Sequence, residues 1–112
     1  MSLSQTGKTS EPLRCRPPAI ATVQIDSAEL RVTRWDFPPG AETGWHRHGW
    51  AYIVVPVSDG RMMLELPGGA TSEVLIQAGN AYERPAGVEH NVINAGDVAF
   101  SFVEIELKAQ PG

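Results

Sequence analysis

The sequence predicts an all-β protein, folded as an antiparallel sandwich or barrel. From Ile20 onward, short runs rich in β-branched and aromatic residues alternate with strong turn signals. No stretch carries the sustained apolar period of 3.6 residues that an amphipathic helix would show. Several runs, such as 53–57 and 98–105, are apolar on both faces. Inner strands that pack on a second sheet or on a partner subunit have this composition.

The predicted strands follow one another at close spacing. We expect them at 29–37, 51–57, 61–66, 72–77, 81–84, 91–94 and 98–107, the last being the longest. Turn sequences such as Pro38-Pro39-Gly40 and Pro67-Gly68-Gly69 separate them. Glycine supplies positive φ, proline fixes φ, and asparagine or aspartate bonds the local backbone, so each of these residues favours a turn.

Length and composition predict one domain preceded by an arm. A chain of 112 residues has the size of a single domain. Residues 1–18 are mostly polar, with prolines and basic residues, so we expect a flexible N-terminal arm there and a single barrel domain over 19–112. Cys15 is the one cysteine of the chain and lies in this arm. It excludes an intrachain disulfide and is a poor ligand candidate.

Charge and hydropathy argue against two classes of partner. The net charge is −4 and the basic residues are scattered, whereas nucleic-acid binding needs clustered Lys and Arg. No apolar run approaches the ~20 residues that span a bilayer, and the N-terminus lacks the apolar core of a secretory signal. We therefore expect a cytoplasmic protein that binds neither nucleic acid nor membrane.

The three histidines have spacings that suggest one metal site. His46 and His48 are two residues apart, so in a strand both side chains point to the same face. A same-face pair can place two nitrogens about 2.0–2.1 Å from a metal such as zinc. The third ligand would be His90, which follows the turn Pro85-Ala86-Gly87. The alternative is a pair of exposed strand histidines and a hydrogen-bonded His90, and the His-x-His pattern alone leaves both open.

Two segments resemble the two motifs of the cupin superfamily. The first motif is matched at Gly40, His46 and His48. The second is matched at Gly79, Pro85, Gly87, His90 and Asn94. The second motif matches at every fixed position and the first at most of them. The resemblance implies an antiparallel jelly-roll β-barrel with a metal held inside by the motif histidines, in a small single-domain cupin that is commonly a homodimer. The chain is also similar to small cupins assigned to β-alanine degradation. We expect the glycines, Pro85 and Asn94 to fix turns rather than to touch a ligand.

The first motif departs from the family pattern at Tyr52, which stands where many cupins carry a glutamate ligand. A phenol with a pKa near 10 is a poor ligand, so we expect Tyr52 to line the pocket and to act catalytically by donating a hydrogen bond or proton. Three neutral imidazoles leave a divalent metal its full charge, which favours an anionic ligand such as a small organic acid. We expect one divalent transition metal ion, with Fe(II) favoured and Zn, Ni, Mn or Cu as the other candidates.

Other pocket residues are predicted less directly. Alternation after His48 puts Trp50 on the side of the histidines, and the further candidates are Met62, Phe100 and Phe102. Glu104 shares the face of the last two. All of them could equally be core, since apolar side chains fill small barrels. Arg34 and Arg84 could anchor a substrate carboxylate through a bidentate fork or could form surface charge pairs.

These observations leave several functions open. The first is an enzyme, a mononuclear metal-dependent dioxygenase or a related lyase or isomerase acting on a small organic acid, because cupins with three-histidine sites include iron-dependent dioxygenases. The second is a non-catalytic metal or small-acid binding protein accessory to a catabolic pathway. The third is a metal-free structural cupin. The sequence shows no strong general base beside Tyr52.

Overall fold

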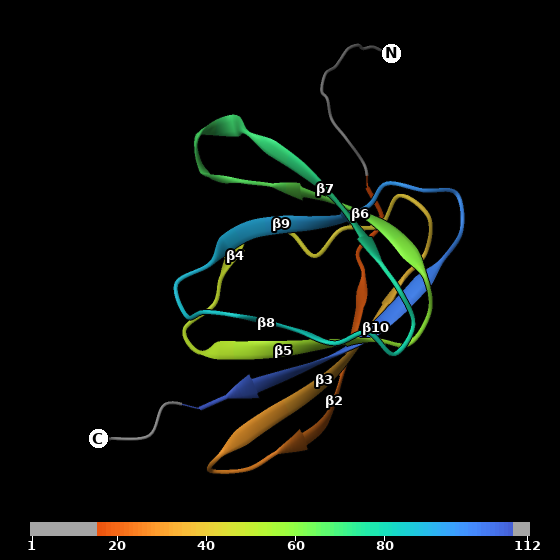
Figure 1. The fold of residues 1–112 in the computed structure, drawn as a ribbon. Coiled ribbons are helices and arrows are strands. Elements are labelled where there is room, and N and C mark those ends of the chain that lie inside the picture. The colour runs from red at the N-terminus through yellow and green to blue at the C-terminus, as the bar shows by residue number, and fades with distance from the viewer. Residues whose placement is uncertain (1–15, 109–112) are drawn as a thin grey trace, which may run out of the picture.

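The computed structural model describes residues 16–108, which fold almost entirely into β-strands (Figure 1). The elements are β2 (Ile20–Asp26), β3 (Leu30–Phe37), β4 (His46–Arg47), β5 (Ala51–Pro56), β6 (Gly60–Glu65), η1 (Pro67–Gly69), β7 (Thr71–Ile76), β8 (Tyr82–Arg84), β9 (Glu89–Asn94) and β10 (Phe100–Leu107). Most of the predicted arm, Cys15 included, lies outside the described residues. Pro17 and Pro18, at its end, pair with Glu42.

The strands form two sheets that face each other (Figure 1). One has the order β2-β3-β10-β5-β8 and the other the order β4-β9-β6-β7. All pairs of named strands are antiparallel, with β10 central to the larger sheet between β3 and β5. The predicted all-β class and antiparallel jelly-roll barrel are confirmed. Within residues 16–108 the sole helix is the three-residue turn η1, and no helix there could cross a membrane.

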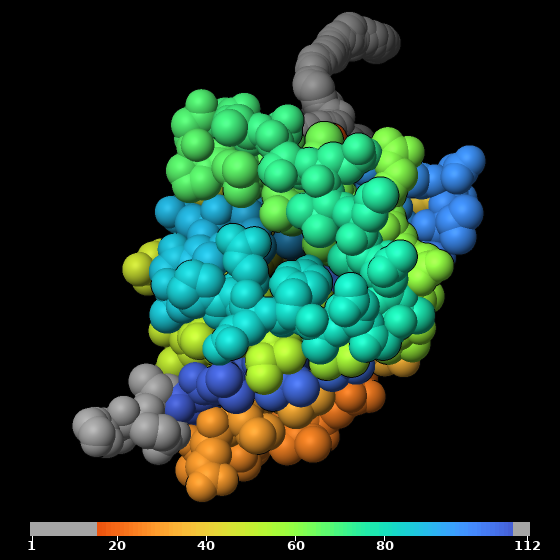
Figure 2. All heavy atoms as spheres, in the orientation of Figure 1, coloured from red at the N-terminus to blue at the C-terminus, as the bar shows by residue number. Residues whose placement is uncertain are grey.

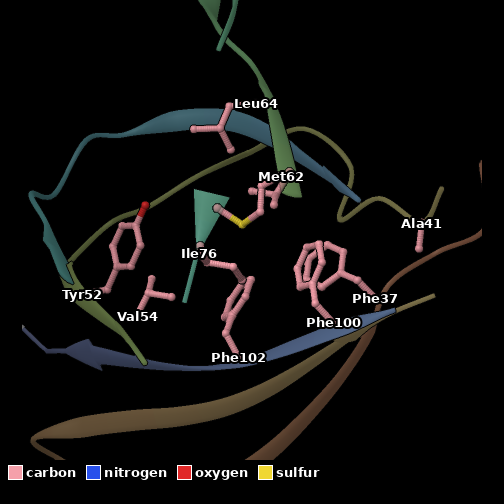
Figure 3. Close-up of a cluster of buried hydrophobic side chains, with 10 residues drawn as sticks. Phe37, Ala41, Tyr52, Val54, Met62, Leu64, Ile76, Phe100 and Phe102 are labelled. Carbon is pink, nitrogen blue, oxygen red and sulfur yellow. The ribbon is translucent and has the colours of Figure 1, made fainter. Parts of the chain in front are cut away.

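An aromatic cluster fills the closed end of the barrel (Figure 3). The ring of Phe37 stacks on that of Phe100 with centroids 4.7 Å apart, and Phe102 lies 5.4 Å from Phe37. Gly60 makes this packing possible, because a Cβ at that position would lie 2.6 Å from Cδ2 of Phe100. The aromatic rings therefore occupy space that only a glycine leaves free.

Turns of the two motif segments hold the strands in place. The side-chain amide of Asn94 donates to the carbonyl oxygens of Phe37 and Val98, both at 3.0 Å, and its oxygen accepts from the Gly96 N–H at 2.9 Å. Asn94 is buried and closes a turn, as the sequence predicts. Gly87 has φ +95°, a conformation that glycine adopts readily.

Candidate metal centre

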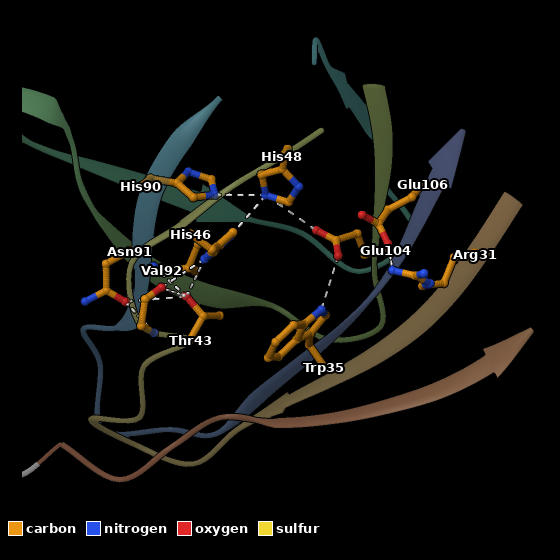
Figure 4. A network of polar contacts seen from close by, with 11 residues as sticks. Arg31, Trp35, Thr43, His46, His48, His90, Asn91, Val92, Glu104 and Glu106 are labelled. Carbon is orange, nitrogen blue, oxygen red and sulfur yellow. Dashed lines mark hydrogen bonds and ion pairs between the residues drawn. The ribbon is translucent and has the colours of Figure 1, made fainter. Parts of the chain in front are cut away.

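Three imidazoles converge at the open end of the barrel (Figure 4). His46 in β4 is the register partner of His90 in β9, and His48 follows β4. The Nε2 atom of His48 lies 3.0 Å from that of His46 and 3.2 Å from that of His90. The structure thus brings together the three histidines that the sequence analysis assigned to one site.

Backbone hydrogen bonds fix the position of His48. Its N–H donates to the carbonyl of Val88 and its carbonyl accepts from the N–H of Gly87, both at 2.8 Å. The β4 strand ends at Arg47, so strand geometry does not continue through His48. The loop that precedes His90 therefore also holds a histidine of the first motif.

The rings of His46 and His48 are oriented by different contacts. Nδ1 of His46 lies 2.9 Å from the carbonyl oxygen of Gly44, and because a carbonyl only accepts, this nitrogen carries the proton. The lone pair of His46 Nε2 is then directed at the other two rings. His48 stacks on the ring of Tyr52. His90 is held by burial, and its Nδ1 has no hydrogen-bond partner.

Burial keeps two of these rings uncharged. Desolvation lowers the pKa of both His48 and His90 to about 4, and the neighbouring His46 adds to the effect. Both imidazoles are therefore neutral at pH 7, the form in which histidine binds a metal.

The donor set fits a transition metal ion. Two nitrogens bound about 2.1 Å from one metal at a right angle are separated by roughly 3.0 Å, close to the observed spacings of 3.0 and 3.2 Å. Three imidazole nitrogens on one side leave other coordination positions open, as catalytic sites require. The orientation of His46, the neutral state of His48 and His90, and the spacing of the three nitrogens all agree with ligation by these histidines.

A buried carboxyl, which the sequence analysis considered only as a weaker candidate on the face of Phe100 and Phe102, stands beside the histidines. Oε2 of Glu104 lies 3.9 Å from Nε2 of His48, and Oε1 accepts a hydrogen bond from the indole of Trp35 at 3.3 Å (Figure 4). Burial raises the pKa of Glu104 to about 7, although the Trp35 bond acts in the opposite direction. The site therefore holds a group that can carry or release a proton near neutral pH. Its inward position follows from alternation with Phe102, the signal that could have located it.

A small internal cavity adjoins the histidines, with about 40 Å³ of room for the centres of water molecules. A recess opens between the green and cyan segments in the space-filling view (Figure 2). Tyr52, Met62 and Phe102, three of the predicted pocket residues, line the cavity with His46 and His90. The remaining lining is Trp35, Thr43, Val54, Leu64, Val74, Tyr82, Arg84, Val92 and Glu104.

Trp50 and Phe100, also predicted as pocket residues, do not line this cavity. The chain bends at Gly49 and Trp50, which breaks the alternation assumed after His48. The indole of Trp50 instead lies beneath the guanidinium of Arg31, 5.5 Å from the ring centroid. Phe100 belongs to the aromatic cluster at the closed end. Both positions are corrections to the predicted pocket.

The two arginines considered as anchors are in different surroundings. Arg34 pairs with Asp36 at 3.2 Å, with both side chains more than a third exposed, which is the surface charge pair considered for it. Arg84 lines the internal cavity.

An outer groove of about 440 Å³ reaches the histidines from the other side. It shares Trp35, Thr43, His46 and Glu104 with the internal cavity, and His48 also lines it. The Trp35–Glu104 hydrogen bond stands at the boundary between the two spaces. The histidines can thus be approached from an outer groove, whose lining includes charged residues such as Arg31 and Glu106, and from an apolar chamber.

Comparisons with known proteins agree with this architecture. Residues 33–106 match the family of the cupin domain. The chain is 58% identical over 93 residues to the beta-alanine degradation protein BauB of Pseudomonas aeruginosa, covering 83% of this chain and 97% of that protein. It is 55% identical to a cupin domain from Bordetella pertussis, with a TM-score of 0.82 and coverage of 86% and 99%. A double-stranded β-helix protein from Klebsiella pneumoniae shares the fold at 22% identity and a TM-score of 0.67, over 89% of this chain and 85% of that one. The chain therefore belongs to the cupin domain family.

Proposed function

We propose that this cupin binds one divalent transition metal ion through His46, His48 and His90 and acts on a small organic acid as a mononuclear metal-dependent dioxygenase. The convergence of the three Nε2 atoms at 3.0 and 3.2 Å carries the proposal. Imidazole donors suit Fe, Zn, Ni and Cu, and Mn is a further candidate. We favour Fe(II) because the proposed chemistry involves dioxygen.

The metal would supply Lewis acidity and open positions for dioxygen and substrate. The protein supplies a chamber with largely apolar walls beside the histidines. Burial raises the pKa of Tyr52 well above its usual value, so its hydroxyl keeps its proton and donates a hydrogen bond to the ligand rather than ligating as a phenolate. Glu104, beside His48, holds or accepts a proton at its carboxyl oxygens.

Two observations support a small acid as the substrate. A 2+ ion held by three imidazoles keeps a net positive charge even when the nearby Glu104 is ionised, so it attracts an anion, and the cavity beside it is small. The Pseudomonas relative is a beta-alanine degradation protein, and we extend to this chain a role in the breakdown of that class of small acid.

Metal analysis and oxygen uptake test the proposal together. Protein purified without oxygen should contain close to one metal ion per chain and should consume dioxygen with one of a panel of short acids. His46→Gln, His48→Gln and His90→Gln should each lose the metal, whereas Arg61→Gln, at an exposed ion pair on β6, should retain it. Unchanged metal content in all three histidine variants would end the proposal.

The same experiment separates catalysis from binding. The name of the Pseudomonas relative describes a degradation protein without stating a reaction, which favours an accessory metal or small-acid binding protein as the second candidate. Stoichiometric metal together with acid binding, but no oxygen uptake or product with any acid, would identify this alternative.

We also propose that the protein is a homodimer formed through the outer face of the larger sheet. The pairing of β2, β3, β10 and β5 aligns Ile25, Val32, Ile105 and Ile53 in one row across this face. In a two-fold dimer the same patch of each copy forms the interface. Because this row consists of uncharged β-branched side chains, the two copies can come into contact without like-charge repulsion. Arg34 and Asp36 add both signs of charge on the same face.

A further inference from the structure

Arg84 brings a positive charge to the wall of the internal cavity. It lies in β8 directly opposite Tyr52 of β5 in the antiparallel register, while Tyr82 lies opposite Val54. Because side chains alternate along a strand, Arg84 and Tyr82 share a face, and both line the cavity with Tyr52 and Val54. Glu83 between them is exposed.

No carboxylate of the described chain neutralises this guanidinium. Among residues 16–108 the arginine ion pairs involve Arg16, Arg31, Arg34 and Arg61, and Arg84 takes part in none. Burial is the main cause of the lowered pKa of His48 and His90, and the charge of Arg84 adds to it at both. The charge therefore acts on the histidine site. A partly buried charge without a partner is costly, so a counter-ion would stabilise this position.

The hydroxyl of Tyr52 is a second polar group that has no protein partner. Tyr52 is 3% exposed, and no hydrogen bond of its hydroxyl is found within the described range. Buried tyrosine hydroxyls usually have a partner. Glu104 is the one carboxyl in the lining, and it already accepts from Trp35. Arg84 and Tyr52 are thus donors available to a ligand.

The size of the chamber limits that ligand. The space open to the centres of water molecules is about 40 Å³, so the chamber suits a small ligand. A carboxylate with a short chain fills this volume. In the metal-depleted protein a second carboxylate would meet either the apolar walls, such as Val54 and Leu64, or the acidic Glu104.

We propose that Arg84 binds the carboxylate of an unbranched monocarboxylic acid of roughly two to four carbon atoms, with Tyr52 as a second donor. The acid then lies in the apolar chamber, and its other end faces the histidines. This inference rests on the proposed small-acid function and adds the anchoring residue and the chain length of the acid.

The test uses metal-depleted protein, so that binding by Arg84 is measured without the metal. Titration with propanoate, followed by NMR at the arginine Nε–H signals, should shift the Arg84 signal. Propanamide, malonate and hexanoate should bind at least about tenfold more weakly. Arg84→Gln should weaken propanoate binding about 10- to 100-fold, and Tyr52→Phe should weaken it several-fold. Arg61→Gln is the matched control and should bind like the wild type.

Several results would overturn the inference. They are the absence of propanoate binding to the metal-depleted wild type, equal binding by Arg84→Gln, and equal binding of propanamide, malonate or hexanoate. If propanoate binds only after Zn²⁺ is added and Arg84→Gln has no effect, the metal is the anion site. In that case the role of Arg84 is wrong while the proposed metal function stands. Conversely, if the histidine variants keep their metal content unchanged and propanoate still binds through Arg84, the anchoring role stands and the proposed metal function is wrong.

Discussion

The imidazole of His48 stacks on the phenol ring of Tyr52, with ring centroids 3.8 Å apart and an interplanar angle of 20°. The tyrosine occupies the sequence position at which many cupins carry a ligating glutamate, yet its contact with the site is through the face of its ring. The ring of Tyr52 thus contacts a histidine, while its hydroxyl is the group that we propose donates to the ligand, so the two roles can be separated.

Two substitutions separate these roles. Tyr52→Phe keeps the stacked ring and should change metal affinity less than about threefold. Tyr52→Leu removes the ring that orients His48 and should weaken metal binding about tenfold, the usual effect of losing a contact that orients a ligand. Competition with a chelator at a temperature where both variants are folded measures the affinities. Equal metal affinity in the Tyr52→Phe and Tyr52→Leu variants would show that the stacked ring does not orient His48.

The raised pKa of Glu104 predicts a pH-dependent stability. The folded pKa is about 7 and the ordinary value is 4.5, so the folded state binds the proton more tightly. The protonated carboxyl contributes stability that is fully present below about pH 4.5 and is lost as pH rises through about 7. Glu104→Gln keeps an acceptor for Trp35 without a charge. In metal-depleted protein at pH 8, the free energy of unfolding of Glu104→Gln should be about 1–3 kcal/mol higher than that of the wild type.

This advantage should shrink as the pH approaches 5. Urea unfolding at both pH values measures it, with Glu73→Gln, at an exposed ion pair, as the control. A difference between wild type and Glu104→Gln that is the same at pH 5 and pH 8 would contradict a raised pKa.

Gly60 is predicted to tolerate no side chain. The added Cβ of Gly60→Ala would lie 2.6–2.8 Å from three side-chain carbons of Phe100, including its Cβ, which cannot move without the backbone. Overpacking of this kind costs about 1–3 kcal/mol. Gly49→Ala meets no atom within 4 Å and serves as the control. Thermal melts should show a lower Tm for Gly60→Ala than for the wild type, and no such decrease for Gly49→Ala. An equal Tm for Gly60→Ala and the wild type would mean that the aromatic side chains can move to make room for the methyl group.

The outer face of the larger sheet gives a test of the dimer. Ile105→Lys places a charge in the centre of the apolar row and should convert the protein to monomers, because the two-fold axis brings the new charges together. Leu75→Lys changes a side chain that is 71% exposed on the other sheet and should leave the dimer intact. Light scattering after size-exclusion chromatography measures the mass. A dimer that survives Ile105→Lys would place the interface elsewhere, and a monomeric wild type would refute the proposal.

The sequence predicted the fold class well because turn residues and strand periodicity are local signals. His46, His48 and His90 could be assigned to one site because two motif segments fix their spacing. Trp50 was misplaced because a bend at residues 49 and 50 interrupts the alternation, and Gly49 is the local signal that could have marked it. Strand alternation puts Glu104 on the face of Phe102, but its proximity to His48 could not be predicted, because it depends on how β10 crosses the barrel, which is a long-range property.

The hydrogen bonds between His48 and the Gly87–Val88 loop also determine when the site can form during synthesis. His48 cannot take its final position until the segment that precedes His90 has left the ribosome, and His90 itself follows directly. A nascent chain that has exposed only the His46–His48 segment presents two imidazoles and no completed site. Loading of the proposed metal would thus be reserved for chains that have paired β4 with β9, so a loaded ion would report that these two strands of the smaller sheet have met.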